Sequence, residues 1–251
     1  MLYIVSTGPG GIEYLTPRAQ AALEESEYII GNSFYMQHLA PFLNGKEIIL
    51  SFMGAEVDRA KKAADLAQNC VVSMVSGGDA GVYGMASIVL EVLEHEAYDI
   101  NVEVIPGVTA ATMAASRLGS PLSGDYVTLS LSDLLTPWDV IEKRLVLAFQ
   151  MEVPVALYNP RSKGRPYNLG KALSIAAQYR KDETPVGIVR HASRPGEEVM
   201  VTTLSELVDN DDLVDMHSIV IVGGTESRIW NRGGDISGII TPRGYHTKYQ
   251  Y

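Results

Sequence analysis

The sequence predicts an α/β protein made of two α/β domains with a ligand cleft between them. Short β-branched runs alternate with helical stretches along most of the chain. This alternation is typical of largely parallel sheets covered by helices on both faces. The 251 residues exceed the usual domain size of about 100–150 residues. Glycine-rich or polar loops follow several predicted strands, at the position where open α/β sheets bind ligands.

The first domain is expected over residues 1–118. Thr16 followed by Pro17 predicts the start of its first helix, because a hydroxyl caps the first turn and proline suits the first helical position. Strands are predicted over residues 2–6, 28–30, 47–50, 71–76 and 102–105. The helices between and after them are predicted over residues 17–25, 34–42, 56–67, 83–94 and 109–117.

A cluster of turn-forming residues predicts a linker over 119–123, and the second domain is expected over 124–245. A tight connection at Ser193–Gly196 predicts an antiparallel hairpin, which makes the second sheet mixed. The segment after Gly223 is rich in glycine and polar residues and is expected to be irregular. Strands are predicted over residues 126–131, 154–158, 186–189, 198–202 and 218–222, and helices over 137–150, 169–179 and 204–209.

The composition excludes several classes of protein. The chain has 20 Lys and Arg against 30 Asp and Glu, and the net charge of −10 opposes nonspecific binding to nucleic acid. A single cysteine, Cys70, excludes intrachain disulfides and cysteine-based metal clusters. No signal sequence begins the chain, and no apolar run approaches the roughly 18 residues of a membrane span. We therefore expect a cytoplasmic protein without nucleic-acid or membrane partners.

The first loop with a chemical signal is Gly8-Pro9-Gly10-Gly11, directly after the opening strand. A dinucleotide fingerprint needs a third glycine where Glu13 stands, and an acidic residue at the end of the second strand. Pro9 also removes a backbone donor that such a loop directs at a phosphate. A tight turn from strand to helix explains the glycines equally well, so both interpretations stay open.

Two further loops follow predicted strands of the first half. In the first, Gly77 and Gly78 allow close approach of a ligand, and Asp79 offers a carboxylate. A helix cap at Asp79 is the alternative, but a cap does not need two glycines before it. In the second, Pro106–Ala110, Thr109 is either a simple N-cap or a ligand contact. The positions of the loops favour binding.

The second half repeats the arrangement at Tyr158–Arg161 and Arg190–Ala192. Residues 153–196 hold eight basic residues against two acidic ones, a local charge of +6 that leaves −16 for the rest of the chain. Arg161, Lys163 and Arg165 lie on a Pro/Gly loop within it. A solvated basic surface is the ordinary explanation. Binding of carboxylate or phosphate is the competing one, since arginine binds both in bidentate fashion.

Groups for acid–base or metal chemistry are scarce. The five histidines show no metal-ligand spacing, so no metal site is expected, and neither a nucleophile elbow nor a Walker loop is present. The polar run Ser130–Asp133 is either a cleft-facing group or a strand end with side-chain caps. A reaction that depends more on positioning than on proton transfer suits these residues.

Several motifs resemble the tetrapyrrole methyltransferase superfamily. They are Gly8-Pro9-Gly10, Thr16-Pro17, Ser76-Gly77-Gly78-Asp79, Pro106-Gly107-Val108-Thr109-Ala110 and Thr184-Pro185-Val186. Longer motifs at residues 77–85, 130–138, 156–162 and 240–245 resemble the branch of this superfamily that acts on precorrin-3B or cobalt-factor III. The resemblance runs almost end to end.

The resemblance implies an S-adenosylmethionine-dependent enzyme with a cofactor site that differs from the Rossmann site. It implies methyl transfer to C17 of the tetrapyrrole with ring contraction, in cobalamin biosynthesis, and a homodimer. The tetrapyrrole carboxylates are expected at Arg161, Lys163 and Arg165, and assistance to ring contraction at Ser132 and Asp133. The cofactor contacts that it implies are Pro9, Gly77, Gly78, Asp79, Val82, Thr109, Ala110, Asn159 and Ala192.

Two alternatives stay open. A sibling enzyme of the superfamily would methylate another ring position, such as C11 of precorrin-4. A nucleotide-binding module would bind without catalysing a reaction. The sequence also leaves open whether the tetrapyrrole already carries cobalt.

Overall fold

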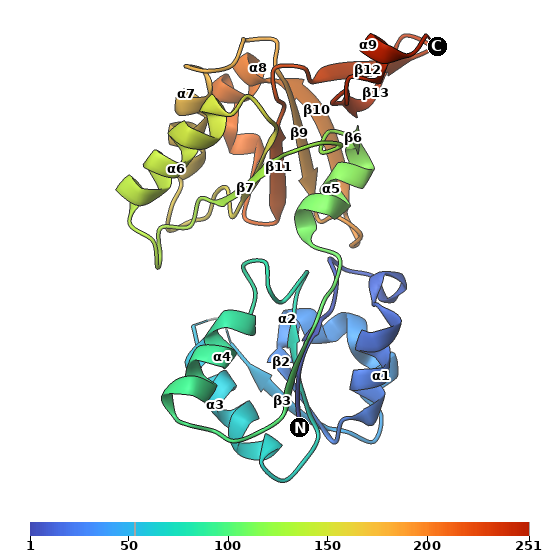
Figure 1. The fold of residues 1–251 in the computed structure, drawn as a ribbon, viewed down its shortest axis with the longest axis vertical. Coiled ribbons are helices and arrows are strands. Elements are labelled where there is room, and N and C mark those ends of the chain that lie inside the picture. The colour runs from blue at the N-terminus through green and yellow to red at the C-terminus, as the bar shows by residue number, and fades with distance from the viewer. Residues whose placement is uncertain (53, 251) are drawn as a thin grey trace. The chain divides into compact units, whose positions relative to one another are not determined.

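The computed structural model describes residues 1–52 and 54–250. The chain divides into two compact units, Met1–Ala110 and Ala111–Tyr251 (Figure 1). Each unit is an α/β structure, as predicted. The linker expected at 119–123 stays a prediction, although Gly119 and Ser120 form a short strand there. Within the described ranges, no helix has both the length and the apolar character needed to cross a membrane.

Unit 1 contains a five-stranded parallel sheet with the order β3-β2-β4-β1-β5. Because β4, β1 and β5 are parallel neighbours, the loops that follow them emerge at the same edge of the sheet. The bounds are β1 Leu2–Ser6, β2 Tyr28–Asn32, β3 Glu47–Ser51, β4 Val72–Ser76 and β5 Val102–Ile105.

Helices cover both faces of this sheet. Leu2 and Ile4 pack on one face with alanines of α3 Glu56–Ala67 and with apolar residues of α4 Ala86–His95. Tyr3 and Val5 point to the opposite face and pack with α1 Pro17–Glu25. This alternation follows from the two-residue period of a strand. The Thr16 hydroxyl caps α1 by accepting the backbone N–H of Ala19 at 3.2 Å, as predicted.

Two predicted helices of unit 1 differ in the structure. The helix expected over 34–42 is α2 Ser33–Met36 followed by the 3-10 segment Gln37–Phe42, which contains Pro41. Proline lacks the N–H that an α-helix requires at this position. The helix expected from residue 83 begins at Ala86, because Tyr83 adopts a left-handed φ of 53° in the preceding turn.

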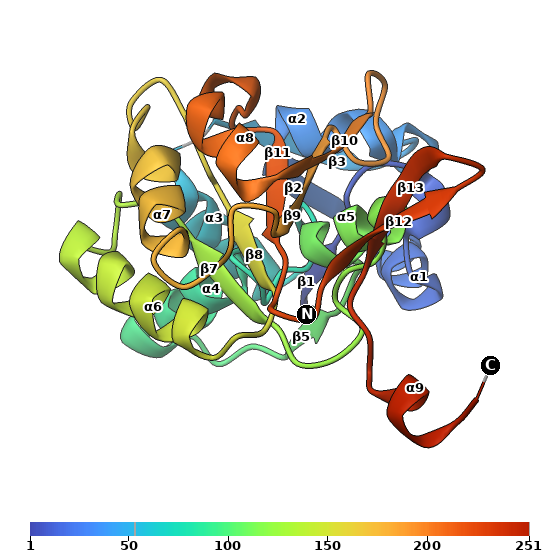
Figure 2. The ribbon, with the colours of Figure 1, turned by 90° about the horizontal axis from the view of Figure 1, so that it is seen from above.

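Unit 2 contains a mixed sheet with the order β10-β9-β11-β8-β7, in which the predicted β9–β10 hairpin is antiparallel. Helices α6 and α7 lie side by side next to β7 and β8 (Figure 2). The bounds are β7 Val127–Ser130, β8 Val155–Tyr158, β9 Pro185–Arg190, β10 Glu198–Thr203 and β11 Ser218–Val222, with α5 Ala110–Leu118, α6 Trp138–Gln150, α7 Asn168–Ala176 and α8 Leu204–Asp209.

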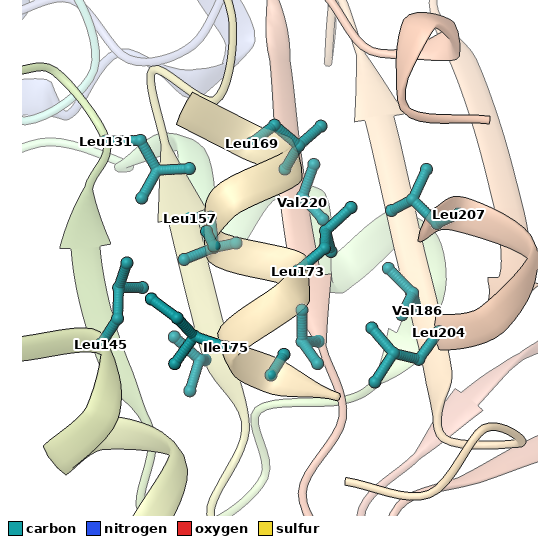
Figure 3. Close-up of a cluster of buried hydrophobic side chains, with 14 of the residues drawn as sticks. Leu131, Leu145, Leu157, Leu169, Leu173, Ile175, Val186, Leu204, Leu207 and Val220 are labelled. Atoms are coloured by element: carbon teal, nitrogen blue, oxygen red, sulfur yellow. The ribbon is translucent and has the colours of Figure 1, made fainter. Parts of the chain in front are cut away.

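One large apolar core lies between the sheet of unit 2 and helices α6 to α8. Figure 3 shows Leu169 and Leu173 of α7 beside Leu157 and Val220 of the strands. These four side chains are fully buried. The core holds the sheet, and with it the loops at the strand ends, in place.

The segment after Gly223 is not irregular, so that prediction is wrong. It forms β12 Arg228–Arg232 and β13 Asp235–Ile240, followed by the short helix α9 Tyr245–Lys248. Strand β13 also pairs with β6 Gly119–Ser120, far away in the sequence. Gly238 makes this pairing possible, because a Cβ there would lie 2.3 Å from the Leu118 carbonyl oxygen.

Candidate functional site

Three loops meet at the carboxyl edge of the sheet in unit 1. Gly8, after β1, and Gly78, after β4, form an antiparallel bridge. The Gly8 N–H donates to the Gly78 carbonyl at 3.0 Å, and the Gly78 N–H donates to the Gly8 carbonyl at 2.8 Å. Pro9 is buried directly beside this bridge. The two glycine motifs found separately in the sequence are therefore parts of one structure.

The Asp79 carboxylate joins the loop after β4 to the loop after β5. Its Oδ1 accepts the backbone N–H of Gly81 at 2.8 Å, and its Oδ2 accepts the backbone N–H of Gly107 at 2.9 Å. A carboxylate oxygen has further lone pairs, so these bonds leave acceptor capacity for a ligand. Asp79 thus orders the backbone of the site and remains half-buried within it.

Gly78 leaves open space beside its backbone. It has a φ of 67°, and the nearest atom to a Cβ built there is the Ala110 backbone nitrogen, at 4.0 Å. The neighbouring Gly77 is instead closely packed, since a Cβ there would lie 2.2 Å from the Tyr35 ring. The loop therefore has one packed side and one open side where a ligand can approach the backbone, near Thr109 and Ala110.

Two serine hydroxyls support the loop after β4, and the sequence analysis missed both. The buried Ser6 Oγ accepts the Ala80 N–H at 2.7 Å, and the buried Ser76 Oγ accepts the Met85 N–H at 3.2 Å. Each serine is the last residue of its strand, directly before a glycine-containing loop, and this position was the available signal. Val82 is half-buried in the same loop, and its N–H donates to the Asp79 carbonyl.

Arg59 of α3 lies buried next to this loop. Its Nη1 donates to Ser51 Oγ at 2.5 Å, and its Nη2 contacts Met85 Sδ at 3.0 Å. Burial lowers the pKa of this guanidinium, and Glu56, at 3.9 Å, opposes that effect only in part. Arg59 therefore connects the end of β3 to the start of α4.

In unit 2, the Ser130 hydroxyl connects two predicted site residues, Ser132 and Asn159. It accepts the Ser132 backbone N–H at 3.2 Å and the Asn159 Nδ2 amide at 3.0 Å. Asn159 has a left-handed φ of 50°, which asparagine tolerates better than most residues. Ser132 is half-buried and Asp133 is exposed. The structure thus brings the Ser132–Asp133 turn close to Asn159.

Tyr158 ties the end of β8 to the start of α5. Its buried hydroxyl accepts the backbone N–H of Ala111 at 2.8 Å. Because the first N–H groups of a helix have no partner within the helix, this bond satisfies one of them. No role for Tyr158 was predicted from the sequence, although it lies within the motif at residues 156–162.

The loop after β9 carries Ala192 between two residues with left-handed backbones, His191 with a φ of 50° and Ser193 with a φ of 61°. The His191 ring stacks on His217 with 4.7 Å between ring centroids. Burial, with smaller contributions from His217 and Arg190, lowers the pKa of His191. Its imidazole is therefore neutral at neutral pH.

The basic stretch is more neutralised than its charge count indicates. Arg161 pairs with Asp211 at 2.7 Å, and Arg190 pairs with Asp215 at 2.9 Å. Both acids lie outside the 153–196 segment. Arg180 is buried and donates to backbone carbonyls, including that of Phe149 at 2.7 Å. Lys163 is exposed, and Arg165 is half-buried with an Nε that has no hydrogen-bond partner among the residues that the structure describes. In the described part of the chain, no group of three or more His, Cys, Asp or Glu side chains is arranged to hold a metal ion.

Comparison with known proteins identifies the family. The family model of tetrapyrrole (corrin/porphyrin) methylases matches residues 1–208. The chain belongs to this family. The match covers unit 1 and most of unit 2 and ends before β11. The glycine loops after β1, β4 and β5 are therefore features of a tetrapyrrole methylase, which uses S-adenosylmethionine.

This tetrapyrrole methylase is similar to named proteins over almost its whole length. It is 42% identical to a probable cobalt-factor III C(17)-methyltransferase of Salmonella typhimurium, over 98% of this chain and 99% of that one. It is 43% identical to the cobalamin biosynthesis protein CbiHC of Archaeoglobus fulgidus over 99% of this chain, but it spans only 53% of that protein's length.

The solved structure of the methyltransferase CobJ is also similar to this tetrapyrrole methylase. The two share 32% sequence identity with a TM-score of 0.89, over 96% of this chain and 99% of CobJ. Most of residues 209–251, which the family model leaves out, therefore falls within the length shared with CobJ.

Proposed function

We propose that this chain is an S-adenosylmethionine-dependent C-methyltransferase that acts at C17 of cobalt-factor III or precorrin-3B, with ring contraction, in cobalamin biosynthesis. The end-to-end likeness to the Salmonella protein carries the proposal, at 42% identity over 98% of this chain. That likeness favours the C17 reaction over methylation at another ring position and over binding without catalysis.

The cofactor contacts that we propose lie on the loops described above. S-adenosylmethionine supplies a methyl group that its sulfonium has already activated. The open side of Gly78, bounded by the Ala110 nitrogen at 4.0 Å, supports cofactor binding at the backbone. The free lone pairs of Asp79 support contacts to hydroxyl or amino groups. The proposed set is Pro9, Gly77, Gly78, Asp79, Val82, Thr109 and Ala110 in unit 1, with Asn159 and Ala192 in unit 2.

The tetrapyrrole is proposed to bind through its carboxylates to the loop after β8. Lys163 and Arg165 are the principal candidates, because Arg161 already has Asp211 as its partner. Arg165 Nε has no acceptor within the described protein, which suits an arginine that receives a carboxylate. Ser132 and Asp133 are proposed to assist the proton movements of ring contraction. For the methyl transfer itself, the main task of the enzyme is to hold the nucleophilic carbon of the tetrapyrrole in line with the S–CH₃ bond.

The proposal includes the expected domains, 1–118 and 124–245 joined by 119–123, and a homodimer in the cytoplasm. Analytical ultracentrifugation tests the dimer, and a sedimentation coefficient of a monomer at micromolar protein would contradict it. Cell fractionation tests the location.

Incubation with S-adenosylmethionine and either cobalt-factor III or metal-free precorrin-3B tests the function. One new methyl group at C17, mapped by NMR and confirmed by mass spectrometry, is the expected result. The substrate that is methylated faster shows whether the natural tetrapyrrole carries cobalt. Methylation at C11 would indicate the sibling enzyme. The absence of label transfer from methyl-labelled cofactor in a single turnover would indicate a binding module. Gly78→Val fills the open side of the loop and is expected to lose methyl transfer.

A further inference from the structure

The loop that carries Ala192 has an unfavourable backbone. His191 and Ser193 both adopt left-handed φ angles, 50° and 61°, on either side of Ala192. For residues with a side chain this conformation is sterically unfavourable. The sequence places no glycine at either position, and the glycine of this loop, Gly196, lies beyond them. Contacts from outside the segment must therefore maintain its shape.

Arg117 and Glu197 provide such contacts at Ser193, whereas His191 is held by His217, whose carbonyl accepts the His191 N–H at 3.1 Å. Arg117 Nε lies 3.0 Å from the Glu197 carboxylate, and Arg117 Nη2 donates to Ser193 Oγ at 3.2 Å. Glu197 Oε2 also accepts the Ser193 backbone N–H at 2.5 Å. Ser193 is thus held through both its backbone and its side chain. We call these three residues the Arg117–Glu197 clamp.

The ion pair of the clamp is only partly exposed to solvent, so solvent screens it less than it screens a surface ion pair. The side chains of Arg117 and Glu197 are 32% and 27% exposed. Burial would raise the pKa of Glu197, but the Ser193 N–H and the Arg117 guanidinium outweigh burial and hold this pKa below its usual value. Glu197 therefore stays ionised at neutral pH, and both of its bonds are assisted by charge.

The same helix is fixed at its other end. Helix α5 carries Arg117 in its last turn, where a cation interacts favourably with the helix dipole. In its first turn, Ala111 N–H donates to Tyr158 Oη at 2.8 Å, next to Asn159. Between these two ends, α5 carries the buried Met113. The Ser193 hydroxyl donates to Met113 Sδ, with 3.1 Å between Oγ and Sδ. One helix thus connects the loops that carry Asn159 and Ala192.

We propose that Arg117 and Glu197 are positioning residues for S-adenosylmethionine, which keep the backbone around Ala192 in the conformation that binds the cofactor. The proposal rests on the proposed function, because it assigns Ala192 to the cofactor site. The clamp acts through Ser193 and does not itself contact the cofactor. Without the clamp, the strained loop relaxes to other backbone conformations. Part of the binding free energy of the cofactor is then used to restore the binding-competent conformation, so the apparent affinity falls.

Isothermal titration calorimetry with S-adenosylmethionine tests the clamp. Arg117→Met and Glu197→Gln keep the volume of the side chains and remove the ion pair. Each is expected to raise the cofactor Kd about tenfold, and the double variant is expected to bind no more weakly than either single variant. Arg117→Lys keeps the charge but not the planar fork, so it is expected to fall between Arg117→Met and the wild type.

Steady-state kinetics and thermal unfolding separate positioning from simple stability. A positioning role raises KM for S-adenosylmethionine while KM for the tetrapyrrole changes little. Lys61→Met is the matched control, because it breaks the Lys61–Glu96 ion pair, 2.6 Å long, on unit 1. An unchanged cofactor Kd in folded Arg117→Lys and Glu197→Gln, with only a lower Tm, would overturn the clamp.

Cofactor binding and methyl transfer by the wild type are measured first. The two results distinguish a failure of the proposed function from a failure of the clamp proposal. If the wild type binds S-adenosylmethionine but does not methylate the corrinoid, the proposed substrate is wrong, and weaker binding by the variants still supports the clamp. If the wild type does not bind S-adenosylmethionine, both proposals are overturned.

Discussion

The Asp79 carboxylate accepts the backbone N–H of Gly107 at 2.9 Å, and so joins the loops that follow β4 and β5. These strands are not adjacent, because β1 lies between them in the sheet. The bond therefore spans the sheet edge over the end of β1, where the Gly8–Gly78 bridge is formed. Asp79 determines the shape of the site through the backbone as well as through any ligand contact.

Asp79→Ala is expected to weaken S-adenosylmethionine binding at least tenfold, because it removes two hydrogen bonds between backbone and carboxylate. Asp79→Asn keeps one acceptor oxygen and should lose less affinity. Calorimetry measures both, with the exposed Asp99→Ala as the control. Unchanged affinity in Asp79→Ala would remove Asp79 from the site.

The two adjacent glycines are expected to respond differently to alanine. Gly77→Ala places a Cβ 2.2 Å from the Tyr35 ring, so it should lower the free energy of unfolding by about 1–3 kcal/mol. Gly78→Ala meets open space, and only its φ of 67° lowers the stability, by about 1–2 kcal/mol. Its main effect should be on cofactor affinity, because the added methyl group occupies the open side of the loop.

Denaturant unfolding and calorimetry on both glycine variants give the comparison. Replacing Tyr35 by alanine in the Gly77→Ala background should recover much of the lost stability. Equal losses of affinity in Gly77→Ala and Gly78→Ala, after correction for the folded fraction, would contradict the assignment of an open and a packed side.

Lys163→Ala and Arg165→Ala are expected to raise KM for the tetrapyrrole, by about tenfold for Arg165 if it binds a carboxylate in bidentate fashion. KM for S-adenosylmethionine should not change. Arg161→Ala is also expected to raise KM for the tetrapyrrole, because it leaves the Asp211 carboxylate without its partner Arg161, and the unpaired carboxylate repels the carboxylates of the substrate. Adding Asp211→Asn to Arg161→Ala removes this charge and should lower KM again in part. If only solubility changes, the basic loop is an ordinary solvated surface.

The stability that Glu197 contributes is expected to disappear in acid. Its pKa is lower in the folded protein than the unfolded value of about 4.3, so its contribution is complete above that value. The contribution is lost as the pH falls through the lower, folded pKa, while Arg117 stays charged throughout.

Urea unfolding of the wild type and Glu197→Gln at several pH values measures this contribution. The difference in unfolding free energy should be constant above about pH 5 and should shrink below about pH 4. A difference that persists unchanged at pH 3 would show that the carboxylate charge is not the source of the stabilisation.

Most of unit 1 could be predicted because its signals are local. Thr16-Pro17 marks the start of α1, and the apolar runs at β1 and β5 match the structure at both ends. The positions of Asp79 and Gly107 could be placed at one edge by the parallel-sheet rule alone. Their hydrogen bond could not, because it depends on the exact path of two loops.

The features that the sequence analysis missed depend on distant partners. Arg161 counts as a free positive charge within its own segment, but its partner Asp211 is 50 residues away. Strand β12 contains Arg228, Asn231 and Arg232, so it looks like a polar tail until its pairing with β13 is known. Tyr158 likewise acquires a role only through Ala111.

The pairing of β6 with β13 affects how the protein folds during synthesis. Gly119 and Ser120 leave the ribosome about 120 residues before their partners Ile239 and Ile240. At roughly 5–20 residues per second, their partners follow about 6–24 seconds later, when all strands of unit 1 have already been synthesised. The β12–β13 hairpin thus joins unit 2 late in synthesis, and chains that stop before it should be recognised by proteases and chaperones as unfinished in that unit.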